Sequence, residues 1–298
     1  MPDPRIVCIG GGHGLSAALS AVRQITGDVT AVVTVADDGG SSGVLREWLG
    51  IPAPGDLRMA IASLARDESR AALLQYRFRE GDLAGHPLGN LLIAALADLR
   101  GDFVDAVDEV SEIAGVRGRV LPATPVPVVL RAEVGGRSIA GQVAIAQGPG
   151  PVDRLYLEPA DPPATEAAVD AIEASTLTVL GPGSLFTSVL AALLVPGIGA
   201  AAARAERVAL VLNVAQQMGE TAGLDAAAHV RALLDHIPGL RLDAVLAHDG
   251  DAPGVLRPVT VDGDALAALR APPVRADLVA SGARHDPDKL AAAIKGLL

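Results

Sequence analysis

An apolar run that passes directly into a cluster of glycines near the start of the chain constrains the fold most strongly. Ile6 to Ile9 are four consecutive apolar residues, typical of a strand buried on both faces. The next five positions are Gly10, Gly11, Gly12, His13 and Gly14. Leu15, Leu19 and Val22 then recur at helical spacing. The pattern predicts a strand, a tight turn and a helix whose first N–H groups can bind a phosphate or pyrophosphate.

Two registers of this glycine cluster fit nucleotide binding. The dinucleotide fingerprint G-x-G-x-x-G/A is met by Gly12, Gly14 and Ala17, whereas a start at Gly10 puts Leu15 at the third position. Both registers stay open. A competing interpretation is a glycine turn that only allows a helix to pack against a strand.

The composition of the 298 residues narrows the range of functions. Half of them are apolar, which predicts a globular chain with a sizeable core. The formal charge is −11 and only 2% of the residues are aromatic, so a nucleic-acid partner is not expected. Lys289 and Lys295 are the only lysines, which excludes a P-loop and a Schiff-base lysine in the body of the fold. A positive phosphate contact must therefore come from an arginine or from a helix N-terminus.

Redox and targeting signals are sparse. Cys8 is the only cysteine and lies in the first predicted strand, so internal disulfides and cysteine-ligated zinc are excluded. Met1 to Arg5 lack the apolar region of a signal peptide. The longest apolar stretch, Val189 to Ala203, is interrupted by proline and glycine and is too short to span a bilayer. We expect a cytoplasmic protein without a membrane span.

Two adjacent carboxylates follow the second predicted strand, Val29 to Val35. Asp37 and Asp38 begin a glycine- and serine-rich loop that includes Ser41 and Ser42. The carboxyl ends of neighbouring parallel strands share an edge, so we expect the aspartates beside the glycine cluster. They could bind a ribose hydroxyl, or hold Mg²⁺ against phosphate oxygens. A purely polar turn is the competing interpretation.

Further polar candidates lie in the helical region that extends through Ala114. Asp56 follows a stiff Pro-Gly connection and is predicted to cap a helix that begins at Leu57. His86 and Asn90 lie about one turn apart at the start of another helix, so the two could face one cavity, although a lone histidine is more often structural.

The second half of the chain repeats the strand–glycine–helix pattern. Leu177 to Leu180 form a predicted strand, followed by a turn and helix start that contain Gly181, Gly183, Ser184 and Thr187. Ser184 is the expected cap of that helix. Two such corners in one sheet suggest two ends of one ligand, or two substrates in one crevice. Asn213 and Gln216, after the strand Val208 to Leu212, could read a base or sugar edge.

The C-terminal region adds one more candidate. Asp286 and Pro287 predict the cap and first residue of a terminal helix. Arg284 and His285, just before that cap, are candidates for a phosphate or base contact.

The element pattern predicts the fold class. Apolar strands alternate with helical segments, which indicates an α/β, Rossmann-like fold, a mostly parallel sheet with helices on both faces. Residues 117–147 read as a β insertion, with strands Val126 to Val134 and Arg137 to Ala146 joined in a hairpin at Gly135-Gly136. Leu278 and Val279 are a further short predicted strand. We expect residues 1–298 to form a single nucleotide-binding domain.

Six motifs together resemble the YvcK-type gluconeogenesis factors. They are GGGHG at Gly10 to Gly14, VADDGGSSG at Val35 to Gly43, PGD at Pro54 to Asp56, GHPLGNLL at Gly85 to Leu92, LGPGSLFTS at Leu180 to Ser188 and GET at Gly219 to Thr221. The family belongs to a CofD-like superfamily that includes the 2-phospho-L-lactate transferases. The resemblance implies a Rossmann-like fold and binding of UDP-sugars, notably UDP-N-acetylglucosamine. It also implies a role in cell shape and cell-wall synthesis during growth on gluconeogenic carbon sources.

The chain departs from the family pattern at two places. His13 stands where the family usually has threonine, and the loop after Asn213 reads VAQQMGET where M-T-Q-x-G-E-T is common. The first change could alter which phosphate oxygen is bound.

The leading hypothesis is a UDP-sugar-binding regulatory protein, which we expect to be a homo-oligomer with regulatory protein partners. A Mg²⁺-dependent 2-phospho-L-lactate-type transferase is the first alternative, with Asp37 and Asp38 as candidate catalytic and magnesium-binding residues. An NAD(H)-binding oxidoreductase is the second. The predicted ligand contacts are Gly10, Gly11, Gly12, His13, Gly14, Asp37, Asp38, Ser41, Ser42, His86, Asn90, Gly181, Gly183, Ser184, Thr187, Asn213, Gln216 and Arg284.

Overall fold

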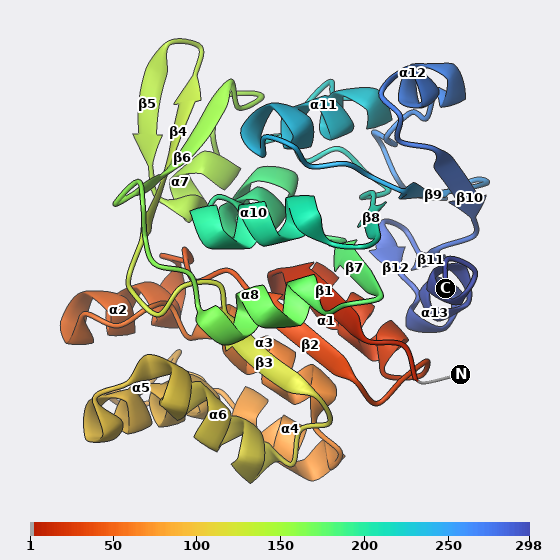
Figure 1. Cartoon of the computed structure of the whole chain (residues 1–298). Coiled ribbons are helices and arrows are strands. Elements are labelled where there is room, and N and C mark those ends of the chain that lie inside the picture. The colour runs from red at the N-terminus through yellow and green to blue at the C-terminus, as the bar shows by residue number, and fades with distance from the viewer. Residues whose placement is uncertain (1–2) are drawn as a thin grey trace.

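A computed structural model describes residues 3–298 and contains a seven-stranded parallel sheet (Figure 1). In spatial order the strands are β10 (Pro273–Ala276), β9 (Ala244–His248), β8 (Val208–Val211), β7 (Leu177–Leu180), β1 (Ile6–Gly10), β2 (Val29–Val33) and β3 (Arg119–Pro122). The chain runs from β1 to β3 on one side and then returns to β7 on the other side of β1. The predicted α/β Rossmann-like fold is confirmed.

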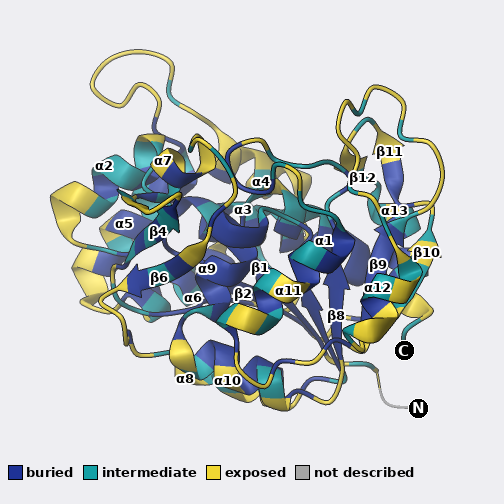
Figure 2. Ribbon diagram, turned by 90° about the horizontal axis from the view of Figure 1, so that it is seen from above, coloured by how far each residue is buried: buried dark blue, intermediate teal, exposed yellow. Residues whose placement is uncertain are grey.

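Helices cover both faces of this sheet. They are α1 (Gly12–Val22), α2 (Gly40–Leu49), α3 (Gly55–Leu64), α4 (Glu68–Gln75), α5 (Leu88–Arg100), α6 (Phe103–Ala114), α7 (Gln142–Ala146), α8 (Glu166–Glu173), the π-helix η1 (Leu185–Leu190), α9 (Ala191–Leu193), α10 (Pro196–Arg204), α11 (Ala226–His236), α12 (Gly263–Ala268) and α13 (Pro287–Lys295). On one face α1 packs between α3 and α13, and on the other α8 packs against α10 (Figures 1 and 2).

The central strands are buried throughout (Figure 2). Every residue of β1, β2, β7 and β8 is buried, which explains why apolar residues dominate these strands and do not alternate with exposed polar ones. Cys8 lies at the centre of this core with no exposed surface, and burial raises the pKa of its thiol to about 12. Cys8 is therefore a core residue, as predicted.

A second, antiparallel sheet corrects the predicted insertion. It consists of β5 (Arg137–Ala140), β4 (Val129–Val134) and β6 (Arg154–Glu158), with the predicted hairpin turn at Gly135-Gly136. The bounds 117–147 were wrong, because β3 pairs with β2 in the main sheet and β6 lies beyond residue 147. The predicted strand Arg137–Ala146 also ends early. Gly141 turns the chain at φ 97°, and helix α7 follows.

The C-terminal segment differs from its prediction in its strands. The sheet is completed by β10, which the sequence did not indicate, and the predicted Leu278–Val279 strand is instead part of a small ribbon of β11 (Val279–Ser281) and β12 (Arg284–His285). The terminal helix α13 begins at Pro287, and the Asp286 carboxylate caps it by accepting from two backbone N–H groups, as predicted.

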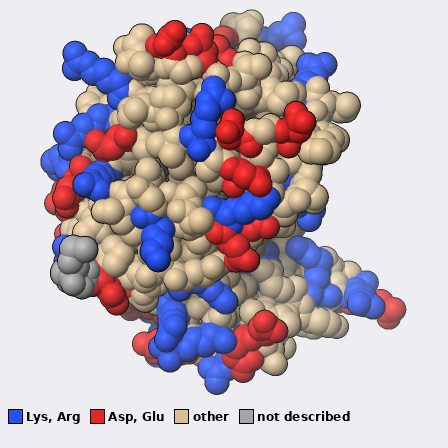
Figure 3. Space-filling view, turned by 90° about the vertical axis from the view of Figure 1, so that its right-hand side faces the viewer, with Lys and Arg blue, Asp and Glu red and all other residues tan. Residues whose placement is uncertain are grey.

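Two surface properties bear on partners. Over β10 and α13, Lys and Arg side chains are interspersed with Asp and Glu (Figure 3), so this face carries mixed charge. In residues 3–298 no single helix is long and apolar enough to cross a membrane; one pair, Leu185–Leu193 with Pro196–Arg204, meets that test only together and is bent by 85°.

Candidate functional site

The glycine turns after β1 and β7 meet at one edge of the sheet. The Thr34 N–H donates to the Gly10 carbonyl (2.9 Å), and the Gly181 N–H donates to the Ile9 carbonyl (2.9 Å), so the ends of β2, β1 and β7 are in register. The strand order reverses between β1 and β7, which is where open α/β sheets bind ligands. A cleft of about 810 Å³ opens at this edge.

The cleft brings together ten of the predicted contacts. They are Gly11, Gly12, His13, Gly14, Asp37, Gly183, Ser184, Asn213, Gln216 and Arg284. Ala17, from one of the two fingerprint registers, also lines it. The other predicted contacts are not among its lining residues: Gly10, Asp38, Ser41, Ser42, His86, Asn90, Gly181 and Thr187.

The first turn of α1 presents free donors to the cleft. Gly11 is the extended N-cap, without a capping side chain, and the Leu15 N–H is the first to bond within the helix, to the Gly11 carbonyl (3.3 Å). The Gly12 N–H donates to the Asp56 carboxylate. Within residues 3–298 the N–H groups of His13 and Gly14 have no acceptor. Two donors at a helix N-terminus thus remain for an anion.

The close approach of the two glycine turns requires Gly14. A Cβ at this position would lie 2.2 Å from the Pro182 carbonyl oxygen. Gly12, by contrast, has φ +64° and open space around it. The cluster therefore serves two purposes, since Gly14 allows the second turn to pack and Gly12 shapes the backbone next to the cleft.

A second carboxylate, Asp56, lies in the cleft beside Asp37. It was predicted to cap the helix at Leu57, but that prediction was wrong, because α3 begins at Gly55 and Asp56 reaches across to the start of α1. Burial, and next the negative charge of Asp37, raises the pKa of Asp56 to about 7, against the opposing effects of the Gly12 N–H and Arg58. Asp56 is therefore poised to gain or lose a proton near neutral pH.

The predicted magnesium ligands Asp37 and Asp38 accept hydrogen bonds from different segments. Asp38 Oδ1 accepts from the Val143 N–H (2.9 Å) at the start of α7, while Asp37 lines the cleft and accepts from the Gly39 N–H (2.9 Å). The two side chains thus have separate tasks. Residues 3–298 also contain no group of three or more His, Cys, Asp or Glu side chains placed to hold a metal ion. Mg²⁺ binding by Asp37 and Asp38 stays a prediction.

The second glycine corner already holds an internal carboxyl group, that of Glu220. Glu220 Oε2 accepts from the N–H groups of Phe186 (3.3 Å) and Thr187 (3.2 Å), and Oε1 accepts from the Thr187 hydroxyl (2.7 Å). Burial raises the pKa of Glu220, and these hydrogen bonds oppose the shift. Glu220, and not Ser184, therefore caps η1, and Thr187 is unavailable to a ligand.

Known proteins resemble the chain over nearly its whole length. The family model described as 2-phospho-L-lactate transferase CofD matches residues 6–279. A protein of Mycobacterium leprae (strain TN) is 49% identical over 99% of this chain and 86% of its own length. The gluconeogenesis factor of Bacillus subtilis (strain 168) is 40% identical, covering 99% and 98% of the two chains. The chain belongs to the CofD family, with relatives named gluconeogenesis factors. A crystal structure of a UPF0052 family member from Bacillus halodurans superposes with TM-score 0.94 at 37% identity and covers 99% of both chains.

His86 and Asn90 of the GHPLGNLL motif form hydrogen bonds with residues outside the cleft lining. The Ser41 hydroxyl bonds to His86 Nδ1 (2.8 Å) and accepts from the Asn90 amide (3.1 Å), and the Asn90 carbonyl accepts from Arg58 Nε (2.9 Å). His86 and Asn90 thus share Ser41 and not the ligand cavity that was predicted. Ser42 is also buried, with its hydroxyl packed where a Cβ of Gly55 would sit.

Side chains after β8 brace the second turn. The Asn213 amide accepts from the Gly183 N–H (3.1 Å) and donates to the Gly183 carbonyl (2.8 Å) and to Gln217 (3.2 Å). Gln217 donates in turn to the Ser184 hydroxyl (2.6 Å). Gln216 accepts from the Gly223 N–H (2.8 Å). The Asn213 amide holds the glycine turn through these hydrogen bonds. Its predicted role was different, namely to read a base or sugar edge.

Arg284 and His285 complete the cleft from the β12 side. Arg284 is exposed, and it is the only Lys or Arg among the described residues that line the cleft. His285 Nε2 donates to the Leu212 carbonyl (3.1 Å), and burial lowers the pKa of its imidazole to about 4. His285 is therefore neutral at physiological pH, and Arg284 supplies the fixed positive charge.

The residues that sequence reasoning missed act over long sequence separations. Asp56 was noted only as a helix cap and as part of the PGD motif, and Glu220 only as part of the GET motif. No local pattern distinguished them from ordinary helix-capping residues.

Proposed function

We propose that this chain binds a nucleotide sugar, with UDP-N-acetylglucosamine as the expected ligand, in the cleft at the β1–β7 edge. We further propose that it is a regulatory protein needed for cell shape and cell-wall synthesis during growth on gluconeogenic carbon sources. The observation that carries the proposal is the pair of His13 and Gly14 N–H groups, which open onto the same cleft as Arg284. Main-chain donors at a helix N-terminus and a guanidinium suit a diphosphate.

The acidic side of the cleft suits the rest of such a ligand. Asp37 and Asp56 lie at the β2 side. Their carboxylates would repel any phosphate placed there, but sugar hydroxyls could donate to the carboxylate oxygens. The relatives named gluconeogenesis factors support a role in growth on gluconeogenic carbon sources.

Calorimetry with UDP-N-acetylglucosamine tests the binding. We expect the wild type to bind and Arg284→Ala to weaken binding at least about tenfold, the ~1.4 kcal/mol or more typical of a charged hydrogen bond. Arg257→Ala is the matched control, because Arg257 is an exposed arginine that does not line the cleft. Absence of binding heat with the wild type, or equal losses in both variants, would contradict the proposal. A growth test of the Arg284→Ala strain on a gluconeogenic carbon source then examines the cellular role.

A phospholactyl-type transferase is a second candidate, favoured by the family description and by Asp56. A carboxylate with a pKa near 7 beside a phosphate cradle suits a general base for an acceptor hydroxyl. The assay supplies a deazaflavin acceptor and a nucleotide-activated phospholactate. Product from the wild type but not from Asp56→Asn would support this candidate, and no product from the wild type would reject it.

A further inference from the structure

Exposed aromatic side chains gather at the side of the molecule where α2 packs against α5 (Figure 1). Trp48, the only tryptophan, is 72% exposed, and its ring lies 6.4 Å from the His86 ring. Tyr76 is 50% exposed and meets Phe78 edge to face, with 5.3 Å between the ring centres. Trp48, Tyr76 and Phe78 are three of the six aromatic residues in the whole chain. Exposed apolar patches that contain aromatic side chains are typical of protein–protein contacts.

A closed loop, residues 78–86, forms the centre of this surface. The Phe78 N–H donates to the His86 carbonyl (3.1 Å), and the Gly85 N–H donates to the Phe78 carbonyl (2.9 Å), so the two ends of the loop are joined. The Leu88 N–H donates to the Tyr76 carbonyl (2.8 Å), which attaches the loop to the start of α5. Leu83, within the loop, is 45% exposed. The loop is therefore a fixed part of the surface that presents apolar side chains to solvent.

The charges of this region are ordered along the chain. Residues 77–82 read Arg-Phe-Arg-Glu-Gly-Asp, so two positive charges precede two negative ones. All four charged side chains are exposed, and within residues 3–298 none of them forms an ion pair. The segment is electrically balanced in a chain whose formal charge is −11. Two copies that approach through this segment thus avoid the repulsion that their net charges would otherwise cause.

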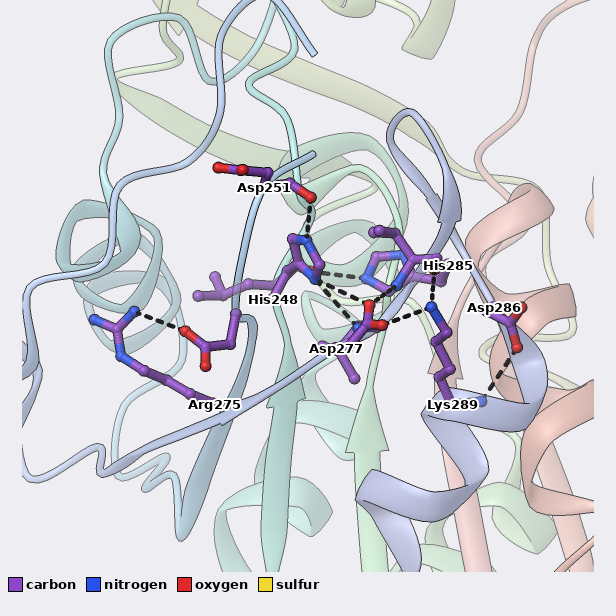
Figure 4. Close-up of polar contacts among 11 residues, drawn as sticks. His248, Asp251, Arg275, Asp277, His285, Asp286 and Lys289 are labelled. Carbon is purple, nitrogen blue, oxygen red and sulfur yellow. Dashed lines mark hydrogen bonds and ion pairs between the residues drawn. The ribbon is translucent and has the colours of Figure 1, made fainter. Parts of the chain in front are cut away.

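The charged side chains over β10 and α13 differ in this respect (Figure 4). Lys289 pairs with Asp277 (2.6 Å), and Arg275 pairs with Asp249 (3.9 Å). These cations each have an anion within the same chain. In the part of the chain that the structure describes, the four charges of residues 77–82 lack such partners and are available to a second molecule.

The charge order of residues 77–82 is complementary to itself. A two-fold axis at the Arg79–Glu80 junction reverses the order in a second copy, so Arg79 faces the partner's Glu80 and Arg77 faces the partner's Asp82. A uniformly acidic or basic partner would be attracted by one half of the segment and repelled by the other half. The charge pattern therefore selects a second copy of this chain.

We propose that the surface formed by Trp48, Tyr76 and residues 77–86 is the contact between two copies of this chain, related by a two-fold axis at Arg79–Glu80. The aromatic side chains and Leu83 supply its apolar part, and the charge pairs set its register. The inference does not depend on which ligand the cleft binds.

A charge exchange tests the two-fold register. Sedimentation equilibrium of the wild type across ~1–100 µM should show a mass that rises toward twice that of one chain. Arg79→Glu and Glu80→Arg each place like charges opposite one another, and each should weaken association at least about tenfold. The double variant Arg79→Glu/Glu80→Arg exchanges the two charges and should associate within about threefold of the wild type.

Arg257→Glu is the matched control, because it makes the same change of net charge at an exposed arginine outside this surface and should associate like the wild type. A wild type that stays monomeric over this range overturns the inference. A dimer that Arg79→Glu leaves intact, or a double variant as weak as either single variant, also overturns it.

The single tryptophan reports the contact directly. As the concentration of the wild type rises, Trp48 emission should shift to shorter wavelength and acrylamide quenching should decrease, because association removes the indole from water. Arg79→Glu should keep the emission of an exposed indole at every concentration. Emission that stays constant while the mass of the wild type doubles would place the contact elsewhere and overturn the inference.

Discussion

Replacing Asp56 with asparagine should change the pH dependence of folding in a defined direction. Burial and the neighbouring Asp37 raise the pKa of Asp56 from 3.8 to about 7, so the folded chain holds a proton that the unfolded chain releases within that window. A raised carboxyl pKa means that stability falls as pH rises between those values. The asparagine side chain keeps the shape and can still accept from the Gly12 N–H, but it does not titrate.

The magnitude follows from the shift. At ~1.36 kcal/mol per pKa unit, the charged form of Asp56 costs up to roughly 4 kcal/mol above pH 7. Between about pH 5.5 and pH 8 the free energy of unfolding of the wild type should therefore fall by ~2 kcal/mol more than that of Asp56→Asn. Asp37 remains beside Arg58 in the variant, so that guanidinium keeps an acidic neighbour.

Urea unfolding at the two pH values, with a chelator present, measures this difference. Asp161→Asn is the control, since Asp161 is an exposed aspartate far from the cleft lining. Parallel pH dependences for the wild type and Asp56→Asn would refute the account of this carboxyl group.

Two further substitutions test the packing of the glycine corners. Glu220→Ala should lower the free energy of unfolding by ~2–4 kcal/mol, because it leaves the N–H groups of Phe186 and Thr187 buried without an acceptor. A loss below ~0.5 kcal/mol in chemical denaturation would contradict this. Gly14→Ala places a Cβ 2.2 Å from the Pro182 carbonyl oxygen and should lower the free energy of unfolding by at least ~2 kcal/mol. The control Gly27→Ala meets open space and should stay within ~0.5 kcal/mol of the wild type. Similar melting temperatures for the two variants would show that the turns are not in tight contact.

The fold was predictable because its signals are local and periodic. Continuous apolar runs such as Ile6–Ile9 identify strands buried on both faces, and the glycine cluster identifies the turn that follows. The register between strands then brings the ends of β1, β2 and β7 together without any further information. The error at Arg137–Ala146 arose because one glycine with positive φ redirects an apolar run from strand to helix.

The site was predictable only in part, since its chemistry depends on contacts between distant segments. Asp56 looks like a helix cap in its own sequence, yet it accepts from Gly12, 44 positions earlier. His86 and Asn90 were correctly placed near each other, but Ser41 fills the space between them. Adjacent aspartates suggested a chelating pair, and the backbone directs them to different partners.

The central claim is that main-chain amides at the start of α1 bind the diphosphate. Backbone amide NMR of the deuterated, ¹⁵N-labelled protein during titration with UDP-N-acetylglucosamine tests it most directly. The account predicts that the signals of His13 and Gly14 shift strongly, and that inorganic pyrophosphate shifts the same two signals. Saturating ligand that moves other resonances and leaves these two unchanged would contradict it.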